Sequence, residues 1–113
     1  MSQFYSVRVY NLKPETSRVE FENFVAQVWI PTVMKKKGCK GLMLLKGYVG
    51  EWTTQKFDYA TIEIWESVRA HREAWGGPRK EGVPPPDLRP FMDRLQSYVE
   101  PESLRTFEFE RQL

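Results

Sequence analysis

Residues 57–75 read FDYATIEIWESVRAHREAW, and within this stretch the spacing of apolar residues changes from that of a strand to that of a helix. The first half alternates between two faces, with Ala60, Ile62 and Ile64 on one and Phe57, Tyr59, Thr61, Glu63 and Trp65 on the other. A period of two predicts a β-strand over 57–65. Ser67 is a favoured helix N-cap residue, so a short helix is expected to follow and to end at Trp75. This helix carries His71, the only histidine of the chain.

The sequence before this stretch predicts two strands with a long helix between them. Alternation predicts a strand over 4–12, and a nearly continuous apolar run predicts another over 42–49. Ser17 is followed three residues later by Glu20, a capping-box pattern that predicts the start of the helix. Pro31 lies inside the helical pattern, so a kink or an early end of the helix is expected there. Lysines at 35–37 and then Gly38 suit its C-terminus.

The sequence after this stretch predicts a loop, a helix and a last strand. Residues 76–87 (GGPRKEGVPPPD) are rich in glycine and proline, and they are expected to be mobile or docked over a cavity. A helical pattern then runs from Leu88 to Val99, and a strand is predicted over 104–110. The resulting order, β-α-β-β-α-β, predicts one α+β domain over 1–113 with a ferredoxin-like fold. In that fold the sheet is antiparallel and four-stranded, and its first and third strands are central.

Composition excludes several classes of function. A net charge of +2 is too small to indicate a nucleic-acid or membrane partner. No apolar run approaches the roughly 18 residues that a transmembrane helix needs, and the N-terminus has no signal-peptide pattern. The single cysteine, Cys39, rules out a disulfide framework within the chain and fits a reducing compartment. We therefore expect a cytoplasmic protein.

The two parities of the predicted strands give the sheet two different faces. One is apolar throughout, and we expect the helices to cover it: Val7, Val9, Met43, Leu45, Ala60, Ile62, Ile64, Phe107 and Phe109. The other mixes aromatic and charged residues: Phe4, Arg8, Tyr10, Leu42, Leu44, Tyr48, Tyr59, Glu63, Trp65, Leu104 and Glu108. This mixed face is too aromatic to remain in water. It is therefore predicted to form a homodimer that buries Leu42, Leu44, Tyr59 and Leu104 around a polar cavity between the two sheets.

Three charged residues of the mixed face are expected to lie on adjacent strands. Arg8 is on a central strand, and Glu63 and Glu108 are on its two neighbours. They form either a charge cluster that neutralises itself or the lining of a ligand cavity. The residues alone leave both interpretations open.

The segment IEIWESVRAHREAW, together with the topology, resembles the dimeric α/β-barrel superfamily and most closely its antibiotic-biosynthesis-monooxygenase-type members. Trp65 and His71 match the tryptophan at the strand end and the histidine on the following helix in that family. The resemblance implies a homodimer, and for some members cofactor-independent oxygenation of polycyclic phenols. The haem-degrading branch adds an asparagine in the first strand, where this chain reads Val7-Arg8-Val9. No cofactor is therefore expected.

These arguments predict a binding site for a small hydrophobic or aromatic molecule. His71 is the candidate catalytic base, because an unperturbed histidine titrates near neutral pH. The candidate ligand-binding residues are Arg8, Tyr10, Tyr59, Glu63, Trp65 and Glu108. A lone histidine provides neither a catalytic triad nor a multi-histidine site within one chain, so no metal is expected. The alternative is a non-catalytic dimer whose barrel is filled by side chains.

Two further features have an ordinary structural explanation. Lysines at 35–37 and Lys40 are best explained as helix-end residues, and 46–49 (KGYV) resembles an RNA-recognition signature only briefly and on the wrong strand. Cys39 lies among these lysines, which could lower its thiol pKa. No second histidine lies nearby to support catalysis by the thiol. We therefore expect no nucleic-acid partner.

Overall fold

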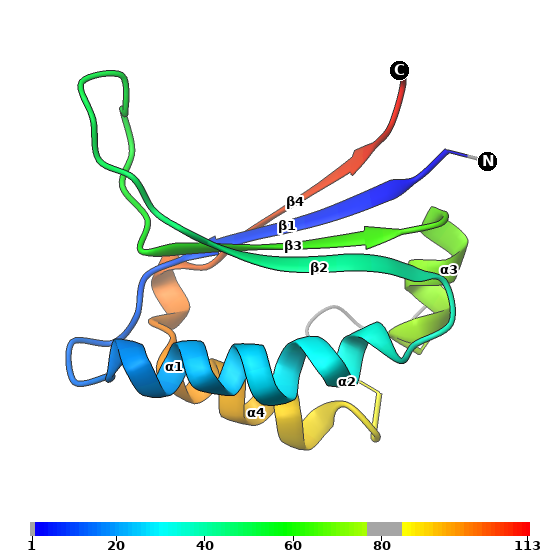
Figure 1. The fold of residues 1–113 in the computed structure, drawn as a ribbon, viewed down its shortest axis with the longest axis horizontal. Coiled ribbons are helices and arrows are strands. Elements are labelled where there is room, and N and C mark those ends of the chain that lie inside the picture. The colour runs from blue at the N-terminus through cyan, green and yellow to red at the C-terminus, as the bar shows by residue number, and fades with distance from the viewer. Residues whose placement is uncertain (1, 77–84) are drawn as a thin grey trace.

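The computed structural model describes residues 2–76 and 85–113, and the chain forms a sheet with helices on one side (Figure 1). The elements are β1 (Phe4–Tyr10), α1 (Arg18–Phe24), the π-helical turn η1 (Val25–Trp29), α2 (Ile30–Met34), β2 (Cys39–Lys46), β3 (Tyr59–Trp65), α3 (Val68–Ala74), α4 (Arg89–Tyr98), the 3-10 turn η2 (Pro101–Ser103) and β4 (Arg105–Glu110). The predicted order β-α-β-β-α-β is confirmed. Residues 77–84 of the predicted loop 76–87 lie outside the described residues, so the place of that loop remains a prediction.

The sheet has the strand order β2-β3-β1-β4, and all its neighbouring strands are antiparallel. The predicted central position of the first and third strands is therefore confirmed. In the centre of the sheet Val7 lies opposite Ile62 of β3 and opposite Phe107 of β4. β2 begins at Cys39 rather than at the predicted residue 42, and its register with β3 shifts between Cys39 and Gly41. The prediction missed this start because a glycine inside the strand weakens the apolar pattern.

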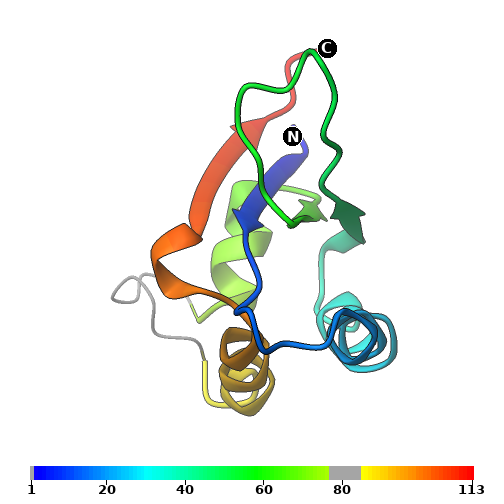
Figure 2. The same ribbon diagram turned by 90° about the vertical axis from the view of Figure 1, so that its left-hand side faces the viewer.

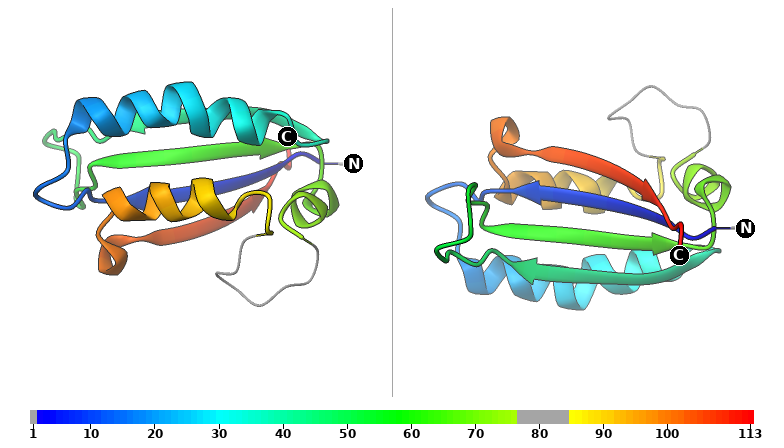
Figure 3. Two further views of the ribbon diagram at one scale, coloured as in Figure 1. Left: turned by 90° about the horizontal axis from the view of Figure 1, so that it is seen from below. Right: turned by 90° about the horizontal axis from the view of Figure 1, so that it is seen from above.

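Two parallel layers make up the molecule. The helix that runs from α1 through η1 to α2 and the helix α4 lie side by side beneath the sheet, as the end-on view and the view from below show (Figures 2 and 3). The short helix α3 stands at one end of the sheet instead (Figure 1). The connection between β2 and β3, residues 47–58, extends beyond the sheet on the side away from the helices (Figure 1). Trp52 in this connection is 90% exposed.

Pro31 neither ends the first helix nor breaks it. The helical stretch continues from Arg18 to Met34, with a π-helical turn over Val25–Trp29 just before the proline. The Ile30 N–H accordingly donates to the Val25 carbonyl, five residues back. A proline inside an α-helix removes one hydrogen bond and its ring clashes with the carbonyl four residues earlier. A wider turn at this point relieves that conflict, which is why the predicted early end of the helix was wrong. The predicted kink stays a prediction.

The prediction of which sheet face the helices cover was also wrong. The face toward the helices, here called the covered face, carries Phe4, Ser6, Arg8, Tyr10, Tyr59, Thr61, Glu63 and Trp65, all buried except the half-buried Arg8. The residues predicted to be buried by a dimer partner instead belong to this core or pack against it: Tyr59 is buried, and Leu42, Leu44 and Leu104 are partly buried. The opposite face, here called the open face, carries the apolar set Val7, Val9, Met43, Leu45, Ala60, Ile62, Ile64, Phe107 and Phe109. Exposure there reaches 41% for Met43, 44% for Leu45, 48% for Phe107 and 57% for Phe109.

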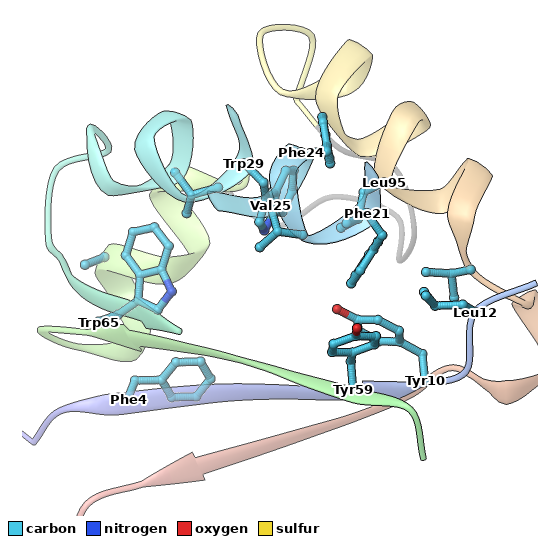
Figure 4. Close-up of a cluster of buried hydrophobic side chains, with 13 residues drawn as sticks. Phe4, Tyr10, Leu12, Phe21, Phe24, Val25, Trp29, Tyr59, Trp65 and Leu95 are labelled. Atoms are coloured by element: carbon cyan, nitrogen blue, oxygen red, sulfur yellow. The ribbon is translucent and has the colours of Figure 1, made fainter. Parts of the chain in front are cut away.

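The size of the side chains explains this inversion. The space between a sheet and a helical layer is wide, and large rings fill it: Tyr10, Tyr59 and Trp65 rise from the strands toward Phe21, Val25 and Trp29 of the first helix (Figure 4). Aromatic side chains bury more area each than the aliphatic residues of the open face. Hydrophobicity by parity does not include this difference in volume, so it selected the wrong face.

Candidate functional site

A buried carboxylate, that of Glu63, joins three elements on the covered face. Glu63 is 1% exposed, and its Oε1 accepts hydrogen bonds from Trp65 Nε1 at 3.0 Å and from Trp75 Nε1 at 3.2 Å. Its Oε2 lies 3.4 Å from Arg8 Nη1. Trp65 ends β3, Trp75 caps the C-terminus of α3, and Arg8 is in β1. A cation and two N–H donors thus satisfy this buried carboxylate.

Arg8 contacts both Glu63 and an aromatic ring. Its guanidinium carbon lies 5.2 Å from the centre of the Trp75 ring, a cation–π distance. The predicted cluster of Arg8, Glu63 and Glu108 is correct only in part. Ser6, rather than Arg8, lies directly opposite both glutamates, and Glu108 pairs with Arg72 of α3 instead.

His71 lies inside an aromatic enclosure. It is 7% exposed, and its ring centre is 5.1 Å from that of Phe4, 5.6 Å from that of Trp65 and 6.4 Å from that of Trp75. Burial, together with the positive charges of Arg72 and Arg8, lowers the pKa of His71 to about 4. The imidazole is consequently neutral at neutral pH.

Local structure fixes the position of His71. Ser67 caps α3 by accepting a hydrogen bond from the Ala70 backbone N–H at 3.1 Å. Gly38 supports the helix from the other side, since a Cβ at this glycine would lie 2.7 Å from the Cβ of Ala70. Gly38 also has φ of +86°, a conformation that favours glycine. The end of α2 and the start of α3 are thus held together at the edge of the site.

Two buried ring nitrogens in the described part of the chain, Trp29 Nε1 and His71 Nε2, have no hydrogen-bond partner, and Arg8 Nη1 has only its 3.4 Å ion pair with Glu63. All three side chains surround the Trp75 ring. The centre of that ring is 5.2 Å from the Arg8 guanidinium carbon, 6.1 Å from the Trp29 ring centre and 6.4 Å from the His71 ring centre. Buried polar atoms without a partner cost free energy, so an acceptor beside this ring would be stabilised by them.

Tyr10 lines a small cavity next to Arg8. The cavity has a volume of about 40 Å³ and lies between the sheet and α4, lined by Arg8, Tyr10, Thr61, Met92, Leu95, Gln96, Val99 and Leu104. The hydroxyl oxygens of Tyr10 and Thr61 are 2.5 Å apart, and burial raises the pKa of Tyr10 to about 12. Tyr10 is therefore a neutral phenol at the wall of this cavity.

Tyr59 is separate from this group. It packs against Phe21 at a ring distance of 4.9 Å, and its hydroxyl donates to Glu22 of α1. The predicted site residues thus divide into two sets. Arg8, Glu63, Trp65 and His71 form one group with Tyr10 beside it, and Glu108 reaches this group through Arg72. Tyr59 belongs to the core near the other end of β3.

Sequence reasoning missed Arg72, Trp29 and the role of Trp75 in the site. Trp75 follows His71 by one helical turn, a spacing that places both on one side of α3. Nothing in the sequence distinguishes Trp29 from an ordinary core residue of an amphipathic helix. Its place next to Trp75 depends on the η1 turn, which no sequence pattern predicted.

The lysine cluster and Cys39 lack the features of a site. Lys36 pairs with Asp87, and Lys40 lies 3.9 Å from Glu66. Burial raises the pKa of the Cys39 thiol, so the expectation of a lowered value was wrong. Among residues 2–76 and 85–113 no cluster of three or more histidine, cysteine, aspartate or glutamate side chains could hold a metal ion. No helix within these ranges is long and apolar enough to cross a membrane.

Comparison with known proteins supports the fold. No family model and no curated protein matches the chain. Among solved structures, a mutant form of SnoaB, a cofactor-independent oxygenase from Streptomyces nogalater, superposes with a TM-score of 0.72 at 16% identity, covering 100% of this chain and 96% of the other. A putative antibiotic biosynthesis monooxygenase from Bordetella bronchiseptica has a TM-score of 0.67 at 19% identity and covers 100% of both chains.

A third solved structure is a dimeric protein of unknown function with a ferredoxin-like fold from Bacteroides fragilis. Its TM-score is 0.63 at 9% identity, with 96% of each chain covered. The resemblance to antibiotic-biosynthesis-monooxygenase-type proteins is thus confirmed at the level of the fold. Identities this low carry no residue roles from those proteins to this chain.

Proposed function

We propose that the protein is an enzyme that binds a small aromatic molecule through an oxygen anion beside Trp75, at the Arg8 guanidinium and the ring nitrogens Trp29 Nε1 and His71 Nε2, and oxygenates it without a cofactor. The donors carry this proposal, because a cation and two neutral N–H groups in a buried space favour negative charge on a ligand oxygen. A phenolate or enolate is such a ligand, and as an electron-rich anion it can itself supply electrons to molecular oxygen. The cofactor-independent oxygenase among the structural neighbours supports this reaction class.

His71 acts in this proposal as a hydrogen-bond donor. Its Nδ1 lies 2.6 Å from Arg72 Nη1, so the nitrogen left for a ligand is Nε2. The expected role as a general base is less compatible with this geometry, because a base needs a free lone pair toward the substrate. His71 remains the proposed catalytic residue, with Arg8 as the charged partner of the same oxygen. Glu63 and Trp65 hold these groups in place.

A non-catalytic dimer with a filled interior is the second candidate, and the size of the cavity favours it. Ligand pockets typically measure about 300–1,000 Å³, whereas the cavity beside Arg8 has about 40 Å³. Binding of an aromatic ring would therefore require α4, whose Met92 and Leu95 line the cavity, to move away from the sheet.

We further propose that the protein is a homodimer and that its open face forms the interface. This face is continuous and apolar, and a two-fold axis would place it against a copy of itself. A hollow of about 640 Å³ lies on this side and is lined by Val9, Gln55, Lys56, Phe57, Arg105 and Phe107. It would become part of the space between the two sheets. A dimeric protein with this fold is among the structural neighbours.

Oxygen uptake and thermal shift with a panel of hydroxylated naphthols and anthrones test the enzyme proposal. His71→Phe keeps an aromatic ring but removes the N–H, and it should lower kcat by roughly 10²-fold or more, as loss of an oxyanion donor does. Arg8→Gln should weaken binding of the anionic ligands by about tenfold, because a charged hydrogen bond is lost. Arg69→Gln, at an exposed arginine of the same helix as His71, is the control. If no compound shifts the melting temperature or consumes oxygen, the non-catalytic dimer is the better explanation.

A further inference from the structure

We propose that Arg72 and Glu108 hold His71 in a single tautomer, with its proton on Nε2, and so make it a donor rather than a base toward the ligand. Arg72 and Glu108 are positioning residues in this proposal. Its catalytic meaning rests on the proposed function, whereas the tautomer itself can be measured without any ligand.

The contact between Arg72 and His71 determines where the imidazole proton lies. A guanidinium group has only donors, and it keeps its proton at all pH values at which proteins fold. Arg72 Nη1 is 2.6 Å from His71 Nδ1, so Nδ1 must supply the lone pair. A neutral imidazole has one N–H, which must then be on Nε2. This nitrogen is the one that is buried without a partner in the described part of the chain.

Glu108 keeps Arg72 in this orientation. Its two carboxylate oxygens accept from Arg72 Nη1 at 2.7 Å and from Arg72 Nη2 at 2.9 Å. Such a two-point contact fixes the plane of the guanidinium as well as its position. The Arg72 guanidinium carbon also lies 5.3 Å from the centre of the Phe4 ring. The same Nη1 atom thus contacts Glu108 on one side and His71 on the other.

Burial and the charged groups around His71 also keep its ring neutral. Arg72 on its own helix and Arg8 of β1 both lower its pKa, and Glu108 of β4 raises it by less than burial lowers it. Protonation would place a hydrogen on Nδ1, directly toward the Arg72 donor. The contact with Arg72 therefore disfavours the imidazolium at neutral pH as well as the other neutral tautomer.

If His71 keeps its hydrogen on Nε2, this limits the class of substrate. With Nδ1 occupied by Arg72 and Nε2 carrying its hydrogen, His71 has no lone pair with which to remove a proton from a ligand. The best substrates are then phenols or enols that are acidic enough to bind as anions from solution. Within the panel, affinity should follow the fraction of each compound that is ionised at the pH of the assay.

Nitrogen-15 NMR of the imidazole tests the tautomer directly. The chain contains one histidine, so after removal of any purification tag the long-range proton–nitrogen spectrum contains a single imidazole. We expect the unprotonated nitrogen to be Nδ1 in the wild-type protein at pH 7. A protonated Nδ1 with a free Nε2 would overturn the proposal.

Variants test whether Arg72 and Glu108 determine the tautomer of His71. Arg72→Met removes the donor and keeps an unbranched side chain, and it should convert the single tautomer into a mixture. Glu108→Gln should do the same to a smaller extent, and it serves if Arg72→Met does not fold. Arg69→Met, at an exposed arginine of the same helix, should leave the spectrum unchanged. An unchanged spectrum in both Arg72→Met and Glu108→Gln would refute the positioning role, whatever the outcome of the oxygen-uptake assay.

Discussion

At the scale of single residues, Glu63 is the side chain on which the candidate site depends most. It is the acceptor for two indole N–H groups and the counterion of Arg8. Glu63→Gln keeps an oxygen acceptor but removes the charge, so Arg8 is left partly buried without its counterion. We expect a loss of about 3 kcal/mol in the free energy of unfolding. Urea denaturation beside Glu73→Gln, an exposed glutamate of α3, measures it. Equal stability of the two variants would contradict the role assigned to Glu63.

The titration of His71 makes a second prediction at this scale. Its folded pKa of about 4 is below the ordinary value of 6.5, so the unfolded chain binds more protons than the folded chain between these pH values. Stability should therefore be fully present above pH 6.5 and should fall as the pH decreases toward 4, by at most about 3 kcal/mol. The charged groups around the ring are Arg72, Arg8 and Glu108.

His71→Phe isolates this contribution. The difference in free energy of unfolding between wild type and variant, measured from pH 7.5 to pH 4.5, should become smaller as the pH falls. Glu108 does not produce the same window, because its lowered pKa affects stability only below the ordinary glutamate value of 4.5. A constant difference across the range would mean that His71 titrates normally.

At the scale of elements, the two capped helices allow a matched comparison. Ser17 accepts from the Glu20 N–H at 3.2 Å, and Ser67 accepts from the Ala70 N–H at 3.1 Å. Replacement of either serine by alanine should cost about 1 kcal/mol in the free energy of unfolding. Only Ser67→Ala should also change the imidazole spectrum of His71, because Ser67 begins the helix that carries it. If Ser17→Ala also changed the spectrum, the environment of His71 would depend on the stability of the whole fold rather than on α3 alone.

Local patterns in the sequence were sufficient to predict these elements. Both serine caps and the alternation in β1 and β3 depend on neighbouring residues only, and each element formed close to its predicted position. The η1 turn was not predictable in this way. Whether a proline ends a helix or is accommodated by a wider turn depends on how strongly the residues beyond it are held. Trp29 and Val33 are fully buried, which favours continuation.

At the scale of the whole molecule, the residues of each face were predicted but the place of each face was not. Strand parity separates Val7 from Arg8 reliably, because alternation is a local property. Which face the helices cover depends on the volume that they leave above the sheet, and no single strand contains that information. For the same reason the candidate site lies between the sheet and the helices rather than between two sheets as predicted. Arg8, Glu63 and His71 nevertheless lie together, as predicted.

The proposed dimer makes a prediction at this scale. Phe107→Glu places a charge on the open face at the edge strand β4, where Phe107 lies opposite Val7 of the central strand β1. Light scattering at micromolar concentration should then report a monomer for the variant and a dimer for the wild type. Val19→Glu introduces the same charge at an exposed apolar residue of α1 and should leave the dimer intact. A wild-type monomer, or a dimer that is unaffected by Phe107→Glu, would mean that the open face is not the interface.

The pairing of β1 with β4 also determines when the sheet can be completed. Phe4 lies opposite Glu110, so β1 pairs with a strand that is synthesised well after it. Until residues 105–110 have left the ribosome, β1 has β3 on one side and an unpaired edge on the other. Contacts between distant parts of a chain form slowly, because a long loop must close before they contribute. Until β4 has emerged, the nascent domain would therefore expose an apolar strand edge that a chaperone could bind.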